Sequence, residues 1–155
     1  MFTGDRSGDF LYAAMYAAGF ANQPHSTHSG DGLELRDAVI TAALHCAPPD
    51  NKPAPQELDN CSKYLRQTAA DMPNLRVCLA LGRIAFDACV RLYRAIGWSD
   101  LRPTPRFAHG ALYRPAGAPV LIGSYHPSQQ NTFTGKLTLP MLTEVFTLAS
   151  MELRR

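Results

Sequence analysis

The sequence predicts an α/β fold in which helices cover both faces of a central, mostly parallel sheet. Stretches with helical apolar spacing alternate along the chain with short, strand-like runs. These runs are almost continuously apolar, as is typical of strands that are buried on both faces. The 155 residues, of which 46% are hydrophobic and 18% charged, suit one globular domain, and we expect it to span residues 1–155.

The first third of the chain predicts one helix and one strand. Residues 7–18 are rich in alanine and predict a helix, with Ser7 as its N-cap and Gly19 as a left-handed stop. Residues 21–35 are rich in Ser, His, Gly and Asp and predict a loop. The apolar run 38–44 predicts a buried strand. The chain thus begins with a loop that leads into a helix, which is how a βα loop looks when its strand is absent.

The middle of the chain predicts two further helices with a strand between them. Four prolines make residues 46–55 irregular, and a helix follows over residues 55–71. Residues 76–81 predict the next strand, and residues 82–96 predict a helix that begins at a glycine. A long, proline-rich connection then spans residues 98–119.

The last predicted strand, residues 120–125, leads directly into the most informative segment of the sequence. His126 stands where this strand should end, and Pro127 forces a turn after it. The polar side chains that follow are Ser128, Gln129, Gln130, Asn131 and Thr132. In open α/β sheets ligands bind outside the carboxyl ends of strands, so this histidine and the loop are placed to act on a ligand. A final helix is expected over residues 139–152.

Composition excludes several classes of protein. No apolar run approaches the roughly 20 residues that span a bilayer, and the N-terminus lacks a signal-peptide pattern, so we expect a cytoplasmic protein without a membrane role. A net charge of +2 and a pI near 8.4 permit nucleic-acid binding without arguing for it, because the basic residues are scattered. Nothing indicates a protein partner.

Several residue types that carry chemistry have both a structural and a functional interpretation. His126 is either satisfied by backbone groups at a strand end or donates a hydrogen bond to a leaving group. Cys46 and Cys61 either pack as small apolar side chains or bind iron or zinc from a proline-rich loop and a helix. The other two cysteines, Cys78 and Cys89, lie within apolar patterns and are expected in the core.

Three other candidates have ordinary structural interpretations when each is considered alone. Asp5 suits the N-terminus of a helix, where a negative charge complements the helix dipole. Asn51 suits a turn, and Phe2 suits a frayed terminus.

Five motifs, in their order along the chain, resemble the iron–sulfur members of the uracil-DNA glycosylase superfamily, most closely the type B (family 5) enzymes. The most specific motifs are Cys46-Ala-Pro-Pro-Asp-Asn-Lys-Pro53 and Gly123-Ser-Tyr-His-Pro-Ser-Gln-Gln-Asn-Thr132. The supporting motifs are Met1–Gly8, Ile40–Ala43 and Ala80–Gly82. The resemblance covers nearly the whole chain and implies a three-layer α/β/α fold.

The resemblance implies a DNA-repair enzyme that extrudes uracil, or another deaminated base, from double-stranded DNA and hydrolyses its N-glycosidic bond. His126 would donate a hydrogen bond to the departing base, and Asp5 and Asn51 match polar active-site positions. Phe2 matches the aromatic residue that stacks on the flipped base. The residues expected to bind the DNA are Ser128, Gln129, Gln130 and Asn131. Ala42 stands where type A enzymes carry a base-reading asparagine, which implies a wider range of bases.

The resemblance also implies a structural [4Fe–4S] cluster. Cys46 and Cys61 match two of its four ligands, and the other two are expected upstream of Met1, together with the first, inner strand of the sheet and a water-activating loop. The chain would then represent the C-terminal part of the family domain. The alternatives are an inactive truncated fragment and an unrelated α/β module that binds DNA or a metal.

Overall fold

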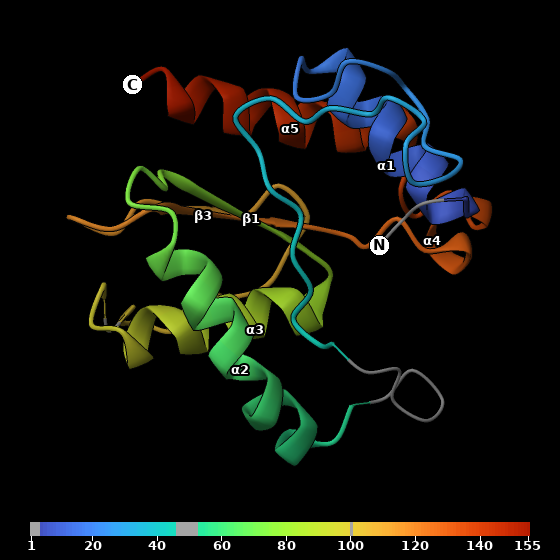
Figure 1. Ribbon diagram of the computed structural model, residues 1–155. Helices are drawn as coiled ribbons and strands as arrows, with labels where there is room; N and C mark the ends of the chain where they lie inside the picture. The colour runs from blue at the N-terminus through green and yellow to red at the C-terminus, as the bar shows by residue number, and fades with distance from the viewer. Residues whose placement is uncertain (1–3, 46–52, 100) are drawn as a thin grey trace. The chain divides into compact units, whose positions relative to one another are not determined.

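The computed structural model describes residues 4–45, 53–99 and 101–155 and confirms the mixed α/β class (Figure 1). Two compact units are distinguished by their internal contacts, and each is described by itself. Unit 1 contains residues 1–40 and 124–155, and unit 2 contains residues 41–123. The single domain expected over residues 1–155 stays a prediction. Within the described part, no helix has the length and apolar character that crossing a membrane requires.

Unit 1 is built around two helices that pack against each other, α1 (Arg6–Ala17) and α5 (Leu139–Leu153) (Figure 1). Each presents a buried apolar stripe, and the ring of Phe20 lies 5.9 Å from that of Phe146 on α5. The Thr138 hydroxyl caps α5, and Pro140 occupies its first turn, where a missing N–H costs nothing. The predicted C-terminal helix is therefore confirmed.

Unit 2 contains a three-stranded sheet and two helices. The strands are β1 (Val77–Leu81), β2 (Leu112–Tyr113) and β3 (Val120–Ser124), and β3 lies between the other two. β2 pairs with β3 in antiparallel register, with Leu112 opposite Ile122. β1 and β3 confirm the strands expected over residues 76–81 and 120–125, whereas β2 lies in a stretch expected to be a plain connection.

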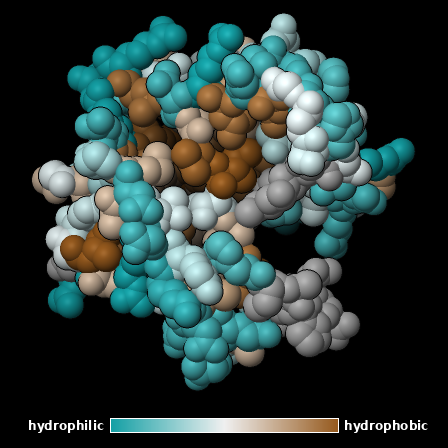
Figure 2. All heavy atoms as spheres, viewed as in Figure 1, coloured by the Kyte–Doolittle hydropathy of each residue, from teal (hydrophilic) through white to brown (hydrophobic). Residues whose placement is uncertain are grey.

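The two helices of unit 2 also confirm the sequence predictions. The helix α3 (Arg83–Ala95) packs on β1, and α2 (Pro55–Ala70) packs on α3. The buried core here consists of Ala80, Phe86, Val90, Tyr93, Leu101 and Leu121. Hydrophilic side chains cover the outer face of α2 (Figure 2). Cys78 and Cys89 pack against this core, as expected, and burial raises the pKa of both thiols.

Three local predictions are wrong. Residues 38–44 run as coil rather than as a strand, and Val39 is 60% exposed. An apolar run becomes a strand only if a neighbour pairs with its backbone, and among the described residues these positions belong to no strand. The N-cap of α1 is Asp5 instead of Ser7. The polar loop after His126 contains a short helix, α4 (Gln129–Phe133), because Ser128 caps its first turn.

Candidate active site

The turn around His126 is held in place by its own side chains. Pro127 is fully buried, and the Asn131 side-chain amide donates a 2.9 Å hydrogen bond to the His126 carbonyl. The Asn131 carbonyl accepts from the Leu137 N–H at 3.0 Å, and Leu137 is itself 1% exposed. Asn131 therefore ties the histidine to a buried anchor in unit 1.

The imidazole of His126 is only partly exposed, and this sets its protonation state. Burial lowers its pKa from the ordinary value of 6.5, while the nearby Asp5 carboxylate raises it, and burial has the larger effect. The ring is therefore mainly neutral at pH 7. A neutral imidazole still carries one N–H, which is what a hydrogen-bond donor to a developing anion needs.

Asp5 lies close enough to His126 to act on it electrostatically, and it also begins α1. Its Oδ1 accepts from the Gly8 N–H at 2.7 Å, which is the N-cap bond of the helix. The expected structural role of Asp5 at the N-terminus of a helix is therefore confirmed. The same carboxylate brings a negative charge to the histidine. The structure thus brings together two of the three residues expected to be catalytic.

A polar loop supports the backbone just before Asp5. The Asp31 carboxylate accepts from the N–H groups of Thr27 at 2.6 Å and Leu33 at 3.0 Å, which closes the loop of residues 26–33. The Ser26 carbonyl of this loop accepts from the Gly4 N–H at 2.9 Å. Gly4 has a φ of +73°, and a Cβ there would lie 3.2 Å from the Thr27 carbonyl. Only glycine fits this approach comfortably.

The side chains expected to bind DNA lie on or beside α4. Gln129 and Gln130 are exposed, whereas Ser128 and Asn131 are partly buried and act on the backbone of the turn. Phe2 and Asn51 lie outside the described residues, as does Cys46.

Sequence reasoning missed two contacts at this turn, in which the cations Arg6 and Lys136 lie over aromatic rings. No sequence signal identifies such pairs, because the partners are separated along the chain.

Cys61, the other expected cluster ligand, lies in α2 of unit 2. The residue is 7% exposed, and its sulfur accepts from the His45 N–H at 3.5 Å. Hydrogen bonds from N–H groups to sulfur are a feature of iron–sulfur sites, so this donor set fits a thiolate ligand. The part of the chain that the structure describes nonetheless contains no group of three or more His, Cys, Asp or Glu residues that could hold a metal. Of the two cysteines expected to bind a [4Fe–4S] cluster, only Cys61 is among the described residues, so the cluster stays a prediction.

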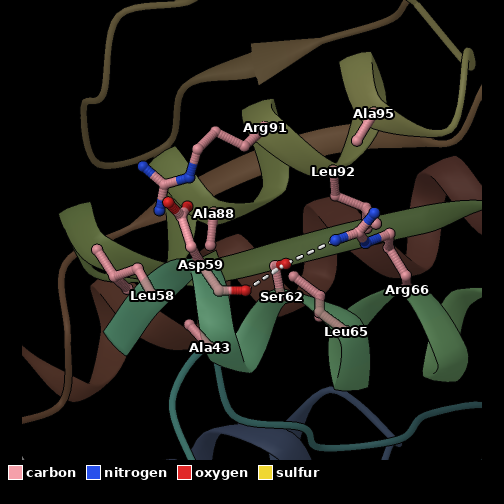
Figure 3. A pocket seen from close by; sticks show the side chains of 10 residues that line it. All are labelled: Ala43, Leu58, Asp59, Ser62, Leu65, Arg66, Ala88, Arg91, Leu92 and Ala95. Carbon is pink, nitrogen blue, oxygen red and sulfur yellow. Dashed lines mark hydrogen bonds between the residues drawn. The ribbon is translucent and has the colours of Figure 1, made fainter. Parts of the chain in front are cut away.

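A separate set of residues, all in unit 2, lines a cavity of about 200 Å³ between α2 and α3 (Figure 3). The apolar part of its lining consists of leucine and alanine side chains. Three of its polar residues bond to one another, since Arg66 donates to the Ser62 hydroxyl at 2.8 Å, which in turn donates to the Asp59 carbonyl at 2.7 Å. We assign no chemistry to this cavity.

Asp5→Asn separates the two roles of this side chain. The amide oxygen still accepts the cap hydrogen bond, but the negative charge is lost, so we expect the His126 pKa to fall further. Asp5→Ala loses the cap as well and should destabilise the protein by about 1 kcal/mol. NMR titration of the His126 ring and urea unfolding measure these effects. Identical titration of His126 in the parent and in Asp5→Asn would show that the Asp5 charge does not reach the ring.

Comparison with known proteins gives one consistent result. The model of the family described as "Uracil DNA glycosylase superfamily" matches residues 1–149. The chain is similar to the "Type-5 uracil-DNA glycosylase" of Mycobacterium tuberculosis, with 46% identity over 147 residues, which are 94% of this chain and 53% of the relative. It is also similar to the enzyme of that name from Thermus thermophilus, with 44% identity over 93% of this chain and 63% of the relative.

A shorter match is the "Type-4 uracil-DNA glycosylase" of Archaeoglobus fulgidus, with 44% identity over 64 residues, which are 40% of this chain and 31% of the relative. The chain spans between half and two thirds of the length of the type-5 relatives. The match to the family model over almost all of its residues confirms the resemblance. The chain belongs to the uracil-DNA glycosylase superfamily.

Proposed function

We propose that this protein hydrolyses the N-glycosidic bond of uracil in double-stranded DNA. The observation that carries the proposal is the partly buried imidazole of His126 just after β3, within the electrostatic reach of Asp5. Burial lowers the pKa of this ring and so favours its neutral form. Membership of the superfamily and the names of the relatives support the same reaction.

The residues suit the charges that develop in this reaction. As the bond between the sugar and the base breaks, its electron pair leaves with the base and positive charge builds up on the sugar. The N–H of His126 would stabilise the anionic base without transferring its proton, since the neutral ring is a weak acid. The Asp5 carboxylate would stabilise the positive sugar and orient the water. That water adds its hydroxide to the sugar, and its proton neutralises the released base.

The direct test is release of uracil from a duplex that contains one U·G pair. We expect release from the U·G duplex and none from the same duplex with C·G. Binding of the duplex without release would instead support the alternative of an inactive, DNA-binding fragment. A duplex with hypoxanthine in place of uracil tests the wider base range that Ala42 implies.

The pH dependence of this reaction should reflect His126. Because its pKa lies below 6.5, the neutral, active ring prevails at and above that pH. We therefore expect a constant rate from pH 8 down to about 6.5 and a fall only below the lowered pKa. The His126→Ala variant should lose this acidic limb and keep a slow, pH-independent rate. A rate that falls already between pH 8 and 7 would contradict the assignment.

We also propose that Cys46 and Cys61 each give a thiolate to a [4Fe–4S] cluster. The cluster would have a structural role and would fix the proline-rich segment that contains Cys46. The burial of Cys61 and the N–H that its sulfur accepts from support this, and further ligands would have to come from outside the described residues. Iron and sulfide content of the purified protein, compared between the parent and Cys61→Ser, tests it. Equal content in both proteins would remove Cys61 from the ligand set.

A further inference from the structure

Two cation–π pairs flank the His126 turn in unit 1. The Arg6 guanidinium carbon lies 5.3 Å from the centroid of the Phe133 ring, at the last residue of α4. The Lys136 ammonium nitrogen lies 4.9 Å from the centroid of the Tyr125 ring, directly before His126. Arg6 of the first pair comes directly after Asp5 in the sequence, and Tyr125 of the second pair comes directly before His126.

Neither of these cations has an acidic partner among the described residues. Other surface cations do, since Arg83 pairs with Asp87 at 2.7 Å and Arg155 lies 3.7 Å from Glu152. The nearest acid to Arg6 along the chain is Asp5, whose Oδ1 is occupied by the Gly8 N–H. Arg6 and Lys136 thus bring positive charge to the surface beside the candidate catalytic histidine.

The aromatic ring that Arg6 contacts, that of Phe133, is largely exposed to solvent. Phe133 is 66% exposed, so burial in the core does not explain its position. An aromatic face attracts a cation and restricts the rotamers of a long side chain. A guanidinium over a ring keeps the N–H groups of its rim available, and these match the geometry of a phosphate. A cation held in this way is ordered before it meets an anion.

We propose that Arg6 and Lys136 bind two backbone phosphates of the DNA on which His126 acts, and that Phe133 and Tyr125 hold these cations in position. This inference rests on the proposed function for the identity of the anion. The competing explanation is that both pairs only stiffen the turn. The two explanations differ in what happens when the charge, rather than the ring, is removed.

The experiment measures binding of a fluorescently labelled, undamaged duplex by anisotropy between about 50 and 200 mM salt. Each phosphate contact contributes about 0.9 to the slope of log K against log salt concentration. We expect Arg6→Gln and Lys136→Gln each to reduce the slope by about 0.9, and the double variant by about twice as much. Arg155→Gln makes the same change of charge in unit 1 and should leave the slope unchanged.

Removing a ring should act differently. Phe133→Leu and Tyr125→Leu keep both charges, so the slope should stay constant while affinity falls by about two- to fivefold. Tyr16→Leu, which changes another exposed aromatic residue of unit 1, serves as the matched control. Far-UV circular dichroism confirms that each variant is folded.

The proposal is overturned if Arg6→Gln and Lys136→Gln show the slope of Arg155→Gln, or if the parent binds the duplex without dependence on salt. It stands if the slopes change as expected even though no uracil is released, a result that would reject only the proposed reaction. Conversely, uracil release together with unchanged slopes would reject only the assignment of these two cations.

Discussion

Replacing His126 with alanine should reduce uracil release by roughly 10²- to 10³-fold, the cost of losing one hydrogen-bond donor to a developing anion. The fold should survive, because the hydrogen bonds that hold the turn use the His126 carbonyl and the side chains of Ser128 and Asn131. Single-turnover kinetics on a U·G duplex measure the loss, and urea unfolding measures the stability.

A matched control is His25→Ala, which removes an exposed imidazole from the same unit. We expect this variant to retain the parental rate. If His126→Ala also remains within about tenfold of the parent, then His126 is not the donor and the catalytic assignment fails. A large loss of both activity and stability would instead point to the structural interpretation of this histidine.

Replacing Gly123 with alanine should destabilise the protein by about 1–3 kcal/mol or more. A Cβ at this position in β3 would lie 2.8 Å from the Ala108 carbonyl oxygen and 3.2 Å from the Phe86 ring. The backbone cannot easily retreat, because the Gly123 N–H and carbonyl bond to Ala111 and Gly110, each at 2.8 Å. A lower midpoint of urea unfolding at an unchanged m-value is the expected result.

The double variant Gly123→Ala/Phe86→Leu identifies which contact is responsible. Phe86→Leu removes the ring but leaves the carbonyl oxygen in place, so we expect it to restore little of the lost stability. Full recovery would show that the ring alone sets the cost. Stability equal to the parent in the single Gly123→Ala variant would mean that the sheet is less tightly packed here than the structure indicates.

Much of this architecture follows from local signals in the sequence. The helix expected over residues 55–71 is present as α2, because a proline and a glutamate that caps its start mark its beginning clearly. The strand before His126 is predicted by its apolar run and by Pro127, which forces a turn after the histidine. Both the position of this histidine at a strand end and the core role of Cys78 were therefore readable from the sequence.

The rest depends on contacts between residues that are distant along the chain. Residues 38–44 have the composition of a strand, but composition does not reveal whether a pairing partner exists. The short α4 looked like a loop because a few polar residues carry no helical period. The contact between Arg6 and Phe133 joins opposite ends of the sequence, so spacing could not suggest it.

The loop of residues 26–33 should lose stability in acid before the rest of unit 1 does, because the hydrogen bonds that close it depend on the ionised Asp31 carboxylate. Its backbone hydrogen bonds lower the pKa of the Asp31 carboxyl from 3.8 to about 2. The stabilisation is therefore complete above pH 3.8 and disappears as the pH falls toward 2. Because this loop also holds Gly4, acid should first loosen the entrance to α1 and only later the core. Amide exchange that rises at Gly4 and Thr27 before it rises in α5 would be the signature of this order.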